Sequence, residues 1–229
     1  MQSATSHPQC AAIIVAAGSS RRMGMDKLAW PLAGVPVLRR TLQAFLNAQS
    51  IHTLVIVCPE ERWQLLEDMD FNKPVLRTDG GAERQESVMR GLAVLDDAIR
   101  LVAVHDGARP LVSPADIDAC VGAAVVHRAA ALARRATETM KRSDDGGFCL
   151  QSVSRENLWC METPQVFETS LLREAYHHVG TLGLVVTDEV SAVQQTGVNV
   201  KFIEPMHPNL KITTPADLAL AQAMMEQSR

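Results

Sequence analysis

Short apolar runs rich in Val and Ile alternate along the chain with longer segments whose apolar residues recur at helical spacing. The apolar runs predict strands at residues 11–17, 53–58, 74–77, 101–105, 129–134 and 198–203. Because these runs are almost continuously apolar, we expect both faces of the strands to be covered. The segments between them, such as the one that begins with Val37 and Leu38, predict amphipathic helices.

Two helix starts are marked by local signals. Ser113-Pro114 and Thr214-Pro215 each place a capping hydroxyl before a proline suited to the first helical turn. The alternation of strands and helices predicts an α/β fold with a doubly wound, mostly parallel sheet. The chain has no internal repeat and no evident domain boundary, so we expect residues 1–229 to form one domain.

One stretch, residues 136–157, interrupts this alternation. It contains RSDDGG, has charged residues on both sides and lacks a sustained helical stripe. The Gly146-Gly147 pair is typical of a tight turn, so the stretch predicts a projecting hairpin or arm. A surface loop is the alternative, and the spacing of residues alone leaves both open.

The composition narrows the class of protein. With 229 residues, 47% hydrophobic and 21% charged, the chain is typical of a globular protein. A net charge of −4 argues against a general nucleic-acid or membrane surface but leaves room for a local basic pocket. The five widely spaced cysteines fit neither a disulfide framework nor a zinc site. With no signal peptide and no membrane-length apolar run, we expect a cytoplasmic protein.

Candidate chemistry gathers where the predicted strands end, the usual ligand site of an open α/β sheet. After the first strand comes AAGSSRRMGMDK, whose glycine and serines would let backbone N–H groups approach an anion. Arg21, Arg22 and Lys27 could supply charge for a polyphosphate. The spacing matches neither G-x-G-x-x-G nor a P-loop, so a solvated basic turn is the alternative.

The strand at 101–105 leads into HDGARP, which places Asp106 and Arg109 at a second strand end. A carboxylate there suits a hard cation such as Mg²⁺, which often takes one or two carboxylates together with substrate phosphates. The alternative for Asp106 is a turn-forming residue before glycine. We expect His105 to be a packed strand-end residue, because no second His or Cys stands at ligand spacing.

A third strand end carries DGGAERQESV. Gly80 and Gly81 permit the close backbone approach that reading a planar base requires, and Ser87 is expected to begin the next helix. A plain strand-to-helix turn is equally economical. Near the C-terminus, NLKITTPADL places Lys211 in a predicted short strand, with its amine directed either to solvent or into the cleft. Taken together, these features favour phosphoryl or nucleotidyl transfer.

Seven segments, in order and over nearly the whole chain, carry a resemblance: AAGSSRRMG…DK, GGAERQESV, VHDGARP, ETMKR, TPQVF, TDEVSA and NLKITTPADL. The chain resembles the bacterial 2-C-methyl-D-erythritol 4-phosphate cytidylyltransferases of the non-mevalonate isoprenoid pathway. The resemblance implies a Rossmann-like fold, a homodimer joined by a projecting β-arm, and Mg²⁺ as cofactor. It also implies in-line attack of the substrate phosphate on the α-phosphorus of CTP, with release of pyrophosphate.

The resemblance also implies roles for particular residues. Arg22 and Lys27 would contact the triphosphate, and Lys211 would meet the α-phosphate and the attacking phosphate. Asp106 would serve the metal and the ribose region. The other implied nucleotide contacts are Ala16, Ala17, Gly18, Gly81 and Ser87. The implied contacts with the second substrate are Arg109, Thr163 and Thr187 from one subunit, with Thr139 and Arg155 reaching in from the partner's arm.

The chain departs from the family pattern at several positions. Ser20 stands where many relatives have a second glycine, and Ala82 stands where they have an acidic residue. Asp26, Lys27 and Leu28 replace a Pro-Lys-Gln triplet, and the spacer between the arginine and the lysine is shorter. These departures concern the path to Lys27 and the reading of the base.

Other functions compete with this one. A ribitol 5-phosphate cytidylyltransferase shares the nucleotide half and differs in the polyol pocket. A molybdopterin-type nucleotidyltransferase shares the opening motif but should lack the arm and TDEVSA. A non-catalytic nucleotide-binding regulatory homologue would have no use for cations gathered around one α-phosphate. A nicotinamide dehydrogenase is disfavoured because the chain has no G-x-G-x-x-G.

Overall fold

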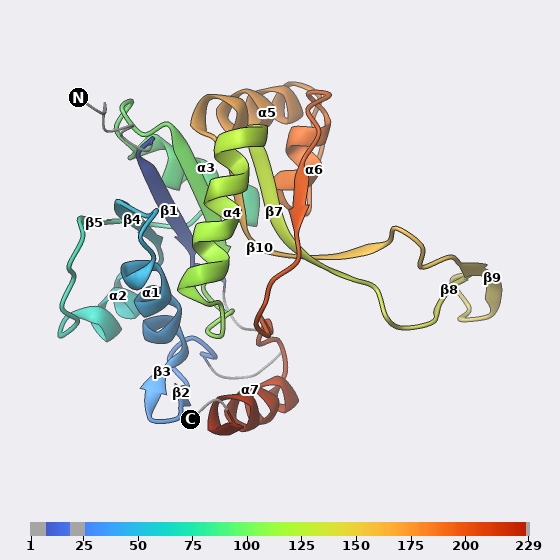
Figure 1. Ribbon diagram of the computed structural model, residues 1–229, viewed down its shortest axis with the longest axis horizontal. Coiled ribbons are helices and arrows are strands. Elements are labelled where there is room, and N and C mark those ends of the chain that lie inside the picture. The colour runs from blue at the N-terminus through green and yellow to red at the C-terminus, as the bar shows by residue number, and fades with distance from the viewer. Residues whose placement is uncertain (1–7, 19–25, 228–229) are drawn as a thin grey trace, which may run out of the picture.

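The computed structural model describes residues 8–18 and 26–227, and within them a seven-stranded sheet forms the centre of the fold (Figure 1). The strand order is β11-β7-β10-β6-β1-β4-β5. The bounds of these strands are β1 Cys10–Val15, β4 Thr53–Val57, β5 Val75–Thr78, β6 Leu101–Asp106, β7 Ala129–Arg135, β10 Trp159–Glu168 and β11 Lys201–Ile203. Each of the six strands predicted from the apolar runs is therefore present, and the last begins later than expected.

Most neighbouring strands run parallel, as predicted. β1 pairs in parallel with β4 and β6, β4 with β5, and β11 with β7. The exception is β10, which lies antiparallel between β6 and β7 and which the apolar pattern does not predict. Its sequence, WCMETPQVFE, mixes polar residues with a proline, and its pairing shifts register between Met161 and Gln165, around the cis Thr163-Pro164 bond. Proline and polar residues are poor signals for a central strand.

Helices cover both faces of the sheet, which confirms the doubly wound arrangement. Their bounds are α1 Val37–Asn47, α2 Glu60–Trp63, the 3₁₀ helix η2 Gln64–Leu66, α3 Arg84–Ala93, α4 Pro114–His127, α5 Thr169–Thr181, α6 Glu189–Gln194 and α7 Pro215–Gln227. One apolar core contains residues of α1, α4 and α7, and the other contains residues of α3, α5 and α6. Ile13 and Ile14, adjacent in β1, belong to different cores because successive strand residues face opposite sides.

The two predicted helix starts are confirmed. α4 and α7 both begin at the expected prolines, Pro114 and Pro215. Before α4, the Ser113 hydroxyl accepts a hydrogen bond from Asp116 N at 3.0 Å, which satisfies one of the free N–H groups of the first turn.

In the part of the chain that the structure describes, no helix has the length and apolar character needed to cross a membrane.

Residues 136–157 form the predicted hairpin rather than a plain loop. β8 (Met140–Ser143) and β9 (Cys149–Val153) pair antiparallel, and Gly147 has a φ of 82° in the turn between them. Figure 1 shows this arm extending away from the sheet, beyond β7 and β10. The base of the arm is closed, because Ala136 N donates to Leu158 O at 2.9 Å. A smaller hairpin of β2 (Pro31–Leu32) and β3 (Val35–Pro36) precedes α1.

Candidate active site

The carboxyl ends of β1, β5 and β6 lie at one edge of the sheet, as their parallel arrangement requires. The turns that follow them touch. A Cβ on Gly80 would lie 2.1 Å from the Ala17 Cβ, so the backbone after β5 passes directly against the turn after β1. Gly107 N, after β6, donates to Val15 O at 2.9 Å. The three predicted strand ends therefore adjoin one another, and Gly18 is exposed.

Arg62 ties together the two described ends of the first turn. This buried side chain from α2 donates to Ala16 O, and its Nε lies 2.9 Å from Asp26 Oδ2. Asp26 is one of the departures from the family pattern, and here it forms an ion pair that holds the residue before Lys27. Arg22, predicted to contact the triphosphate, lies outside the described residues.

Asp106, the last residue of β6, lies at the centre of a group of cations. Lys211 Nζ lies 2.7 Å from Asp106 Oδ2, and Arg84 Nε lies 3.2 Å from Oδ1. Arg109 Nε lies further away, 3.9 Å from Oδ2. Burial by itself would raise the pKa of Asp106, but Arg84, Lys211 and Arg109 hold that pKa well below its ordinary value. The carboxylate is therefore ionised near neutral pH, and it does more than form a turn.

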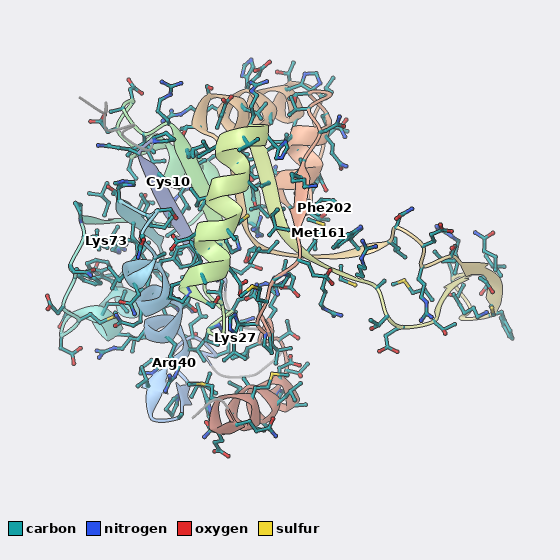
Figure 2. The ribbon with its side chains drawn as sticks, in the orientation of Figure 1. Cys10, Lys27, Arg40, Lys73, Met161 and Phe202 are labelled. Atoms are coloured by element: carbon teal, nitrogen blue, oxygen red, sulfur yellow. The ribbon has the colours of Figure 1, made fainter. Side chains whose placement is uncertain are left out.

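Lys211 and Lys27 meet at one short segment. Lys27 Nζ donates to the carbonyl of Ile212 at 2.8 Å, and Ile212 N donates to Ala108 O at 2.8 Å. The segment is thus pinned to the turn after β6. The prediction of a strand around Lys211 is wrong, because residues 207–214 lie outside every strand of the described chain. The hydrogen bond from Ile212 N goes to Ala108 in a turn and not to a neighbouring strand. Figure 2 shows Lys27 in the region between the sheet and α7.

Arg109 and Thr163 connect Asp106 with β10. Thr163 Oγ1 accepts a hydrogen bond from Asp106 N at 3.1 Å and lies 3.0 Å from His105 Nδ1. Arg109 donates to Asn209 O at 2.7 Å, and Asn209 Nδ2 donates to Thr163 O at 2.7 Å. His105 is fully buried, as predicted, and burial lowers its pKa to about 3. It therefore remains a neutral packed residue that helps to hold Thr163.

Gly81 and Ser87 lie together after β5. Gly81 N donates to Ser87 Oγ at 3.1 Å, and Ser87 Oγ donates to Glu83 O at 3.2 Å. The prediction that Ser87 begins the helix is wrong, because α3 already begins at Arg84. The first turn of α3 consists of polar residues, so the apolar period that marks a helix in the sequence becomes visible only later.

Arg84 is the residue of this cluster that sequence reasoning missed. Besides Asp106, it contacts both carboxylate oxygens of Glu189, at 2.5 and 2.9 Å. Its only signal was its position inside GGAERQESV, where a charge in the first turn of a helix looks solvated. The structure instead places Arg84 between the carboxylates of Asp106 and Glu189, which are more than 80 residues apart in the chain.

The remaining predicted residues fall into two groups. Thr187 is exposed and directly precedes Asp188, whose carboxylate accepts a hydrogen bond from Gln165 in β10 at 3.0 Å. Thr139 and Arg155 lie on the arm instead, where Arg155 donates to Thr137 O at 2.5 Å. Figure 2 marks Met161 near the point where β10 leaves the sheet towards the arm. A single chain therefore does not bring Thr139 and Arg155 to Asp106.

The donor set at Asp106 suits a cation that takes part of its coordination from a substrate. Among the described residues, no group of three or more His, Cys, Asp or Glu could hold a metal ion. Mg²⁺ commonly binds one or two carboxylates together with substrate phosphates and water. The ionised Asp106 would supply one such carboxylate, and the neighbouring Lys211 suits the substrate phosphates. The cluster as a whole can bind a polyphosphate and neutralise charge that develops on phosphorus.

Known proteins show the same organisation along nearly the whole chain. A family model for 2-C-methyl-D-erythritol 4-phosphate cytidylyltransferase matches residues 10–227. The chain is 42% identical to the 2-C-methyl-D-erythritol 4-phosphate cytidylyltransferase of Parasynechococcus marenigrum over 217 residues, which cover 93% of this chain and 96% of the relative. It is 40% identical to the enzyme of the same name from Aeromonas hydrophila over 223 residues, which cover 96% and 91%.

Solved structures agree with the sequence comparison. The crystal structure of 4-diphosphocytidyl-2C-methyl-D-erythritol synthase from Anaerococcus prevotii matches with a TM-score of 0.84 and 26% identity, covering 96% of this chain and 99% of the other. The crystal structure of 2-C-methyl-D-erythritol 4-phosphate cytidylyltransferase from Thermus thermophilus matches with a TM-score of 0.79 and 31% identity, covering 95% and 99%. The chain therefore belongs to the 2-C-methyl-D-erythritol 4-phosphate cytidylyltransferase family.

Proposed function

We propose that the chain transfers a cytidylyl group from CTP to 2-C-methyl-D-erythritol 4-phosphate. An oxygen of the substrate phosphate forms a bond to the α-phosphorus of CTP, the bond from that phosphorus to the bridging oxygen breaks, and pyrophosphate leaves. The product is 4-diphosphocytidyl-2-C-methyl-D-erythritol. The observation that carries the proposal is the cluster of Asp106, Lys211 and Lys27 at the end of β6, in a chain of this family.

The lysines supply the charge that this reaction needs. Negative charge grows on the oxygens around the α-phosphorus as the new bond forms, and fixed cations stabilise it. Lys211 and Lys27 are linked through one pinned segment, so both amines can approach the same phosphate group. Arg22 is assigned to the triphosphate from the first turn. The attacking phosphate monoester is already largely anionic near pH 7, so no general base is required.

We assign the nucleotide to the turns that touch after β1 and β5. The close approach of Gly80 to Ala17 supports this assignment, because it brings the backbones of the two turns together at the strand ends. Ser87 offers a hydroxyl that is already bonded to Gly81 N. The residues assigned to the nucleotide in these turns are Ala16, Ala17, Gly18, Gly81 and Ser87.

Asp106 is assigned to Mg²⁺ and the ribose region. Its low pKa keeps the carboxylate ionised, and the oxygen that Lys211 contacts would become available to the cation when the Lys211 amine turns to the phosphates. The triphosphate would supply further oxygen ligands. When bound, Mg²⁺ withdraws negative charge from the phosphate oxygens.

We propose that a second copy of the chain completes the polyol-phosphate site in a homodimer. The projecting arm supports this, because Phe148 and Leu150 near its tip are 75% and 62% exposed. A guanidinium suits a phosphate because its fork can bind two oxygens at once. The residues assigned to the polyol phosphate are Arg109, Thr163 and Thr187 from one subunit, and Thr139 and Arg155 from the arm of the other.

The most direct test offers the purified protein CTP, ATP, GTP or UTP with Mg²⁺ and measures pyrophosphate release. Each nucleotide is combined with methylerythritol phosphate or with ribitol 5-phosphate. We expect turnover with CTP and methylerythritol phosphate. Turnover with ribitol phosphate instead would establish the alternative acceptor. A folded protein that releases no pyrophosphate with any pair would be a regulatory homologue.

We also propose a cytoplasmic location. All five cysteines are free, which supports this location.

Replacing Lys27 with alanine should lower kcat by a larger factor than it raises KM for CTP. The reason is that Lys27 is assigned to charge that grows in the transition state, and such contacts affect kcat more than ground-state binding. Steady-state pyrophosphate release at varied CTP measures both constants. Lys73→Ala is a matched control, because the Lys73 amine also donates to backbone carbonyls but at the C-terminal end of α1. A change in KM alone would reduce Lys27 to a binding residue.

A further inference from the structure

We propose that Arg84 is a positioning residue that keeps Asp106 in place when substrates bind, with Glu189 and Tyr176 as its anchor. The inference rests on the proposed function, because it concerns how the carboxylate assigned to Mg²⁺ and the ribose is held. Arg84 comes from α3, Asp106 from β6, Tyr176 from α5 and Glu189 from α6. The contacts therefore join four elements around one guanidinium.

The guanidinium of Arg84 is held more firmly by Glu189 than by Asp106. Its two terminal nitrogens contact the two oxygens of Glu189 at 2.5 and 2.9 Å, a forked arrangement that fixes its plane. Glu189 is fully buried, and its Oε1 also accepts a hydrogen bond from Tyr176 OH at 2.8 Å. Glu189 is therefore an immobile anchor, and Arg84 Nε is left to contact Asp106 Oδ1 at 3.2 Å.

Lys211 is the exchangeable partner of Asp106. It contacts Oδ2 at 2.7 Å, but its side chain is 42% exposed and ends a flexible stem, whereas the Arg84 side chain is 27% exposed and tied to Glu189. In the proposed reaction, the Lys211 amine turns to the phosphates. Arg84 then continues to hold Oδ1, so the carboxylate keeps its orientation while Oδ2 becomes available.

The same anchor reaches the segment assigned to the second substrate. Glu189 is the first residue of α6 and follows Thr187 by two positions. On the other side of Thr187, Val186 N donates to Gln85 Oε1 at 3.4 Å, the residue next to Arg84. The first turn of α3 thus contacts the chain on both sides of Thr187. Arg84 links the carboxylate of the nucleotide site to the polyol-phosphate segment.

The test compares the affinity for CTP with Mg²⁺ among variants by titration calorimetry, which remains measurable in variants that do not turn over. Arg84→Lys keeps a positive charge beside Glu189 but lacks the fork. We expect it to weaken binding or to lower kcat/KM by about 10- to 100-fold, as for other residues that orient ligand groups. Arg173→Lys is the matched control, because Arg173 in α5 donates to Leu92 O of the same helix α3 at 2.8 Å. It should remain near wild type.

A double-mutant cycle separates positioning from general stability. If Arg84 acts through Asp106, the change from Arg84→Lys should shrink to less than about threefold in an Asp106→Asn background. Additive losses would overturn the inference, because they indicate a structural role alone. If Arg84→Lys proves unstable on thermal unfolding, Tyr176→Phe takes its place in the same cycle, since it removes only one hydrogen bond from the anchor.

The outcomes also separate this inference from the proposed function. A wild-type enzyme that turns over CTP and methylerythritol phosphate, with an Arg84→Lys variant equal to it in affinity and kcat/KM, overturns the role of Arg84 and leaves the function standing. A folded wild-type protein that neither binds nor turns over CTP overturns both.

Discussion

Replacing Lys211 with alanine should lower kcat for cytidylyl transfer by about 100- to 1,000-fold, the range found when one fixed donor to a developing charge is removed. Lys211 Nζ lies 2.7 Å from Asp106 Oδ2, at the strand end where the phosphates are assigned. The variant should stay folded, because Arg84 and Arg109 still face the Asp106 carboxylate. Pyrophosphate release at saturating CTP and methylerythritol phosphate measures the loss.

Lys201→Ala is the control for this experiment, because Lys201 is an exposed lysine in β11 to which no role is assigned. It should retain wild-type kcat. A Lys211→Ala enzyme whose kcat is unchanged and whose KM alone rises would contradict transition-state stabilisation by Lys211. In that case the lysine would contribute only to substrate binding.

Deleting residues 137–154 should abolish both dimerisation and turnover. The deletion removes β8, β9 and Thr139 and leaves Lys27, Lys211 and Asp106 untouched. The chain can be closed without disturbing the sheet, because Ala136 and Leu158 are already paired at the base of the arm. Light scattering measures the mass of the variant, and pyrophosphate release measures its activity.

The circular dichroism spectrum and thermal unfolding of the deletion variant provide the control, since the central sheet should be retained. CTP binding should also persist, because the residues assigned to the nucleotide belong to the strand ends of the same chain. A folded monomer with full activity would show that the arm has no part in catalysis. A dimer without the arm would show that the subunits associate elsewhere.

The sheet could be predicted largely because its strands are apolar on both faces. β1, β4 and β6 are nearly continuous apolar runs, and they are almost entirely buried in the structure. β10 could not be predicted in this way, because it contains METPQ, where polar residues and a proline interrupt the apolar pattern. The signal for a strand was therefore weakest at the place where the sheet contributes Thr163 to the cluster.

The site was predictable where its chemistry lies at a strand end and less so where it depends on long-range contacts. Asp106 could be identified from its position at the end of β6. Arg84 could not be identified in this way, because its position in the cluster depends on its contact with Glu189, which lies far along the chain. Lys211 was identified by motif, yet its local structure was predicted wrongly, because only the fold shows that Ile212 bonds to a turn. Roles for Thr139 and Arg155 depend on a second chain and remain predictions.

Subunit mixing tests the central claim, a cytidylyltransferase site shared between two copies of the chain. Lys211→Ala and Arg155→Ala proteins, each with little activity alone, are unfolded together in equal amounts, refolded and assayed with CTP and methylerythritol phosphate. If the arm acts on the partner subunit, each mixed dimer has one intact site, and activity should recover to about one quarter of wild type. If the site is built within one chain, both sites of the mixed dimer are damaged. Mixtures that show only the residual activity of the two variants would therefore contradict the account.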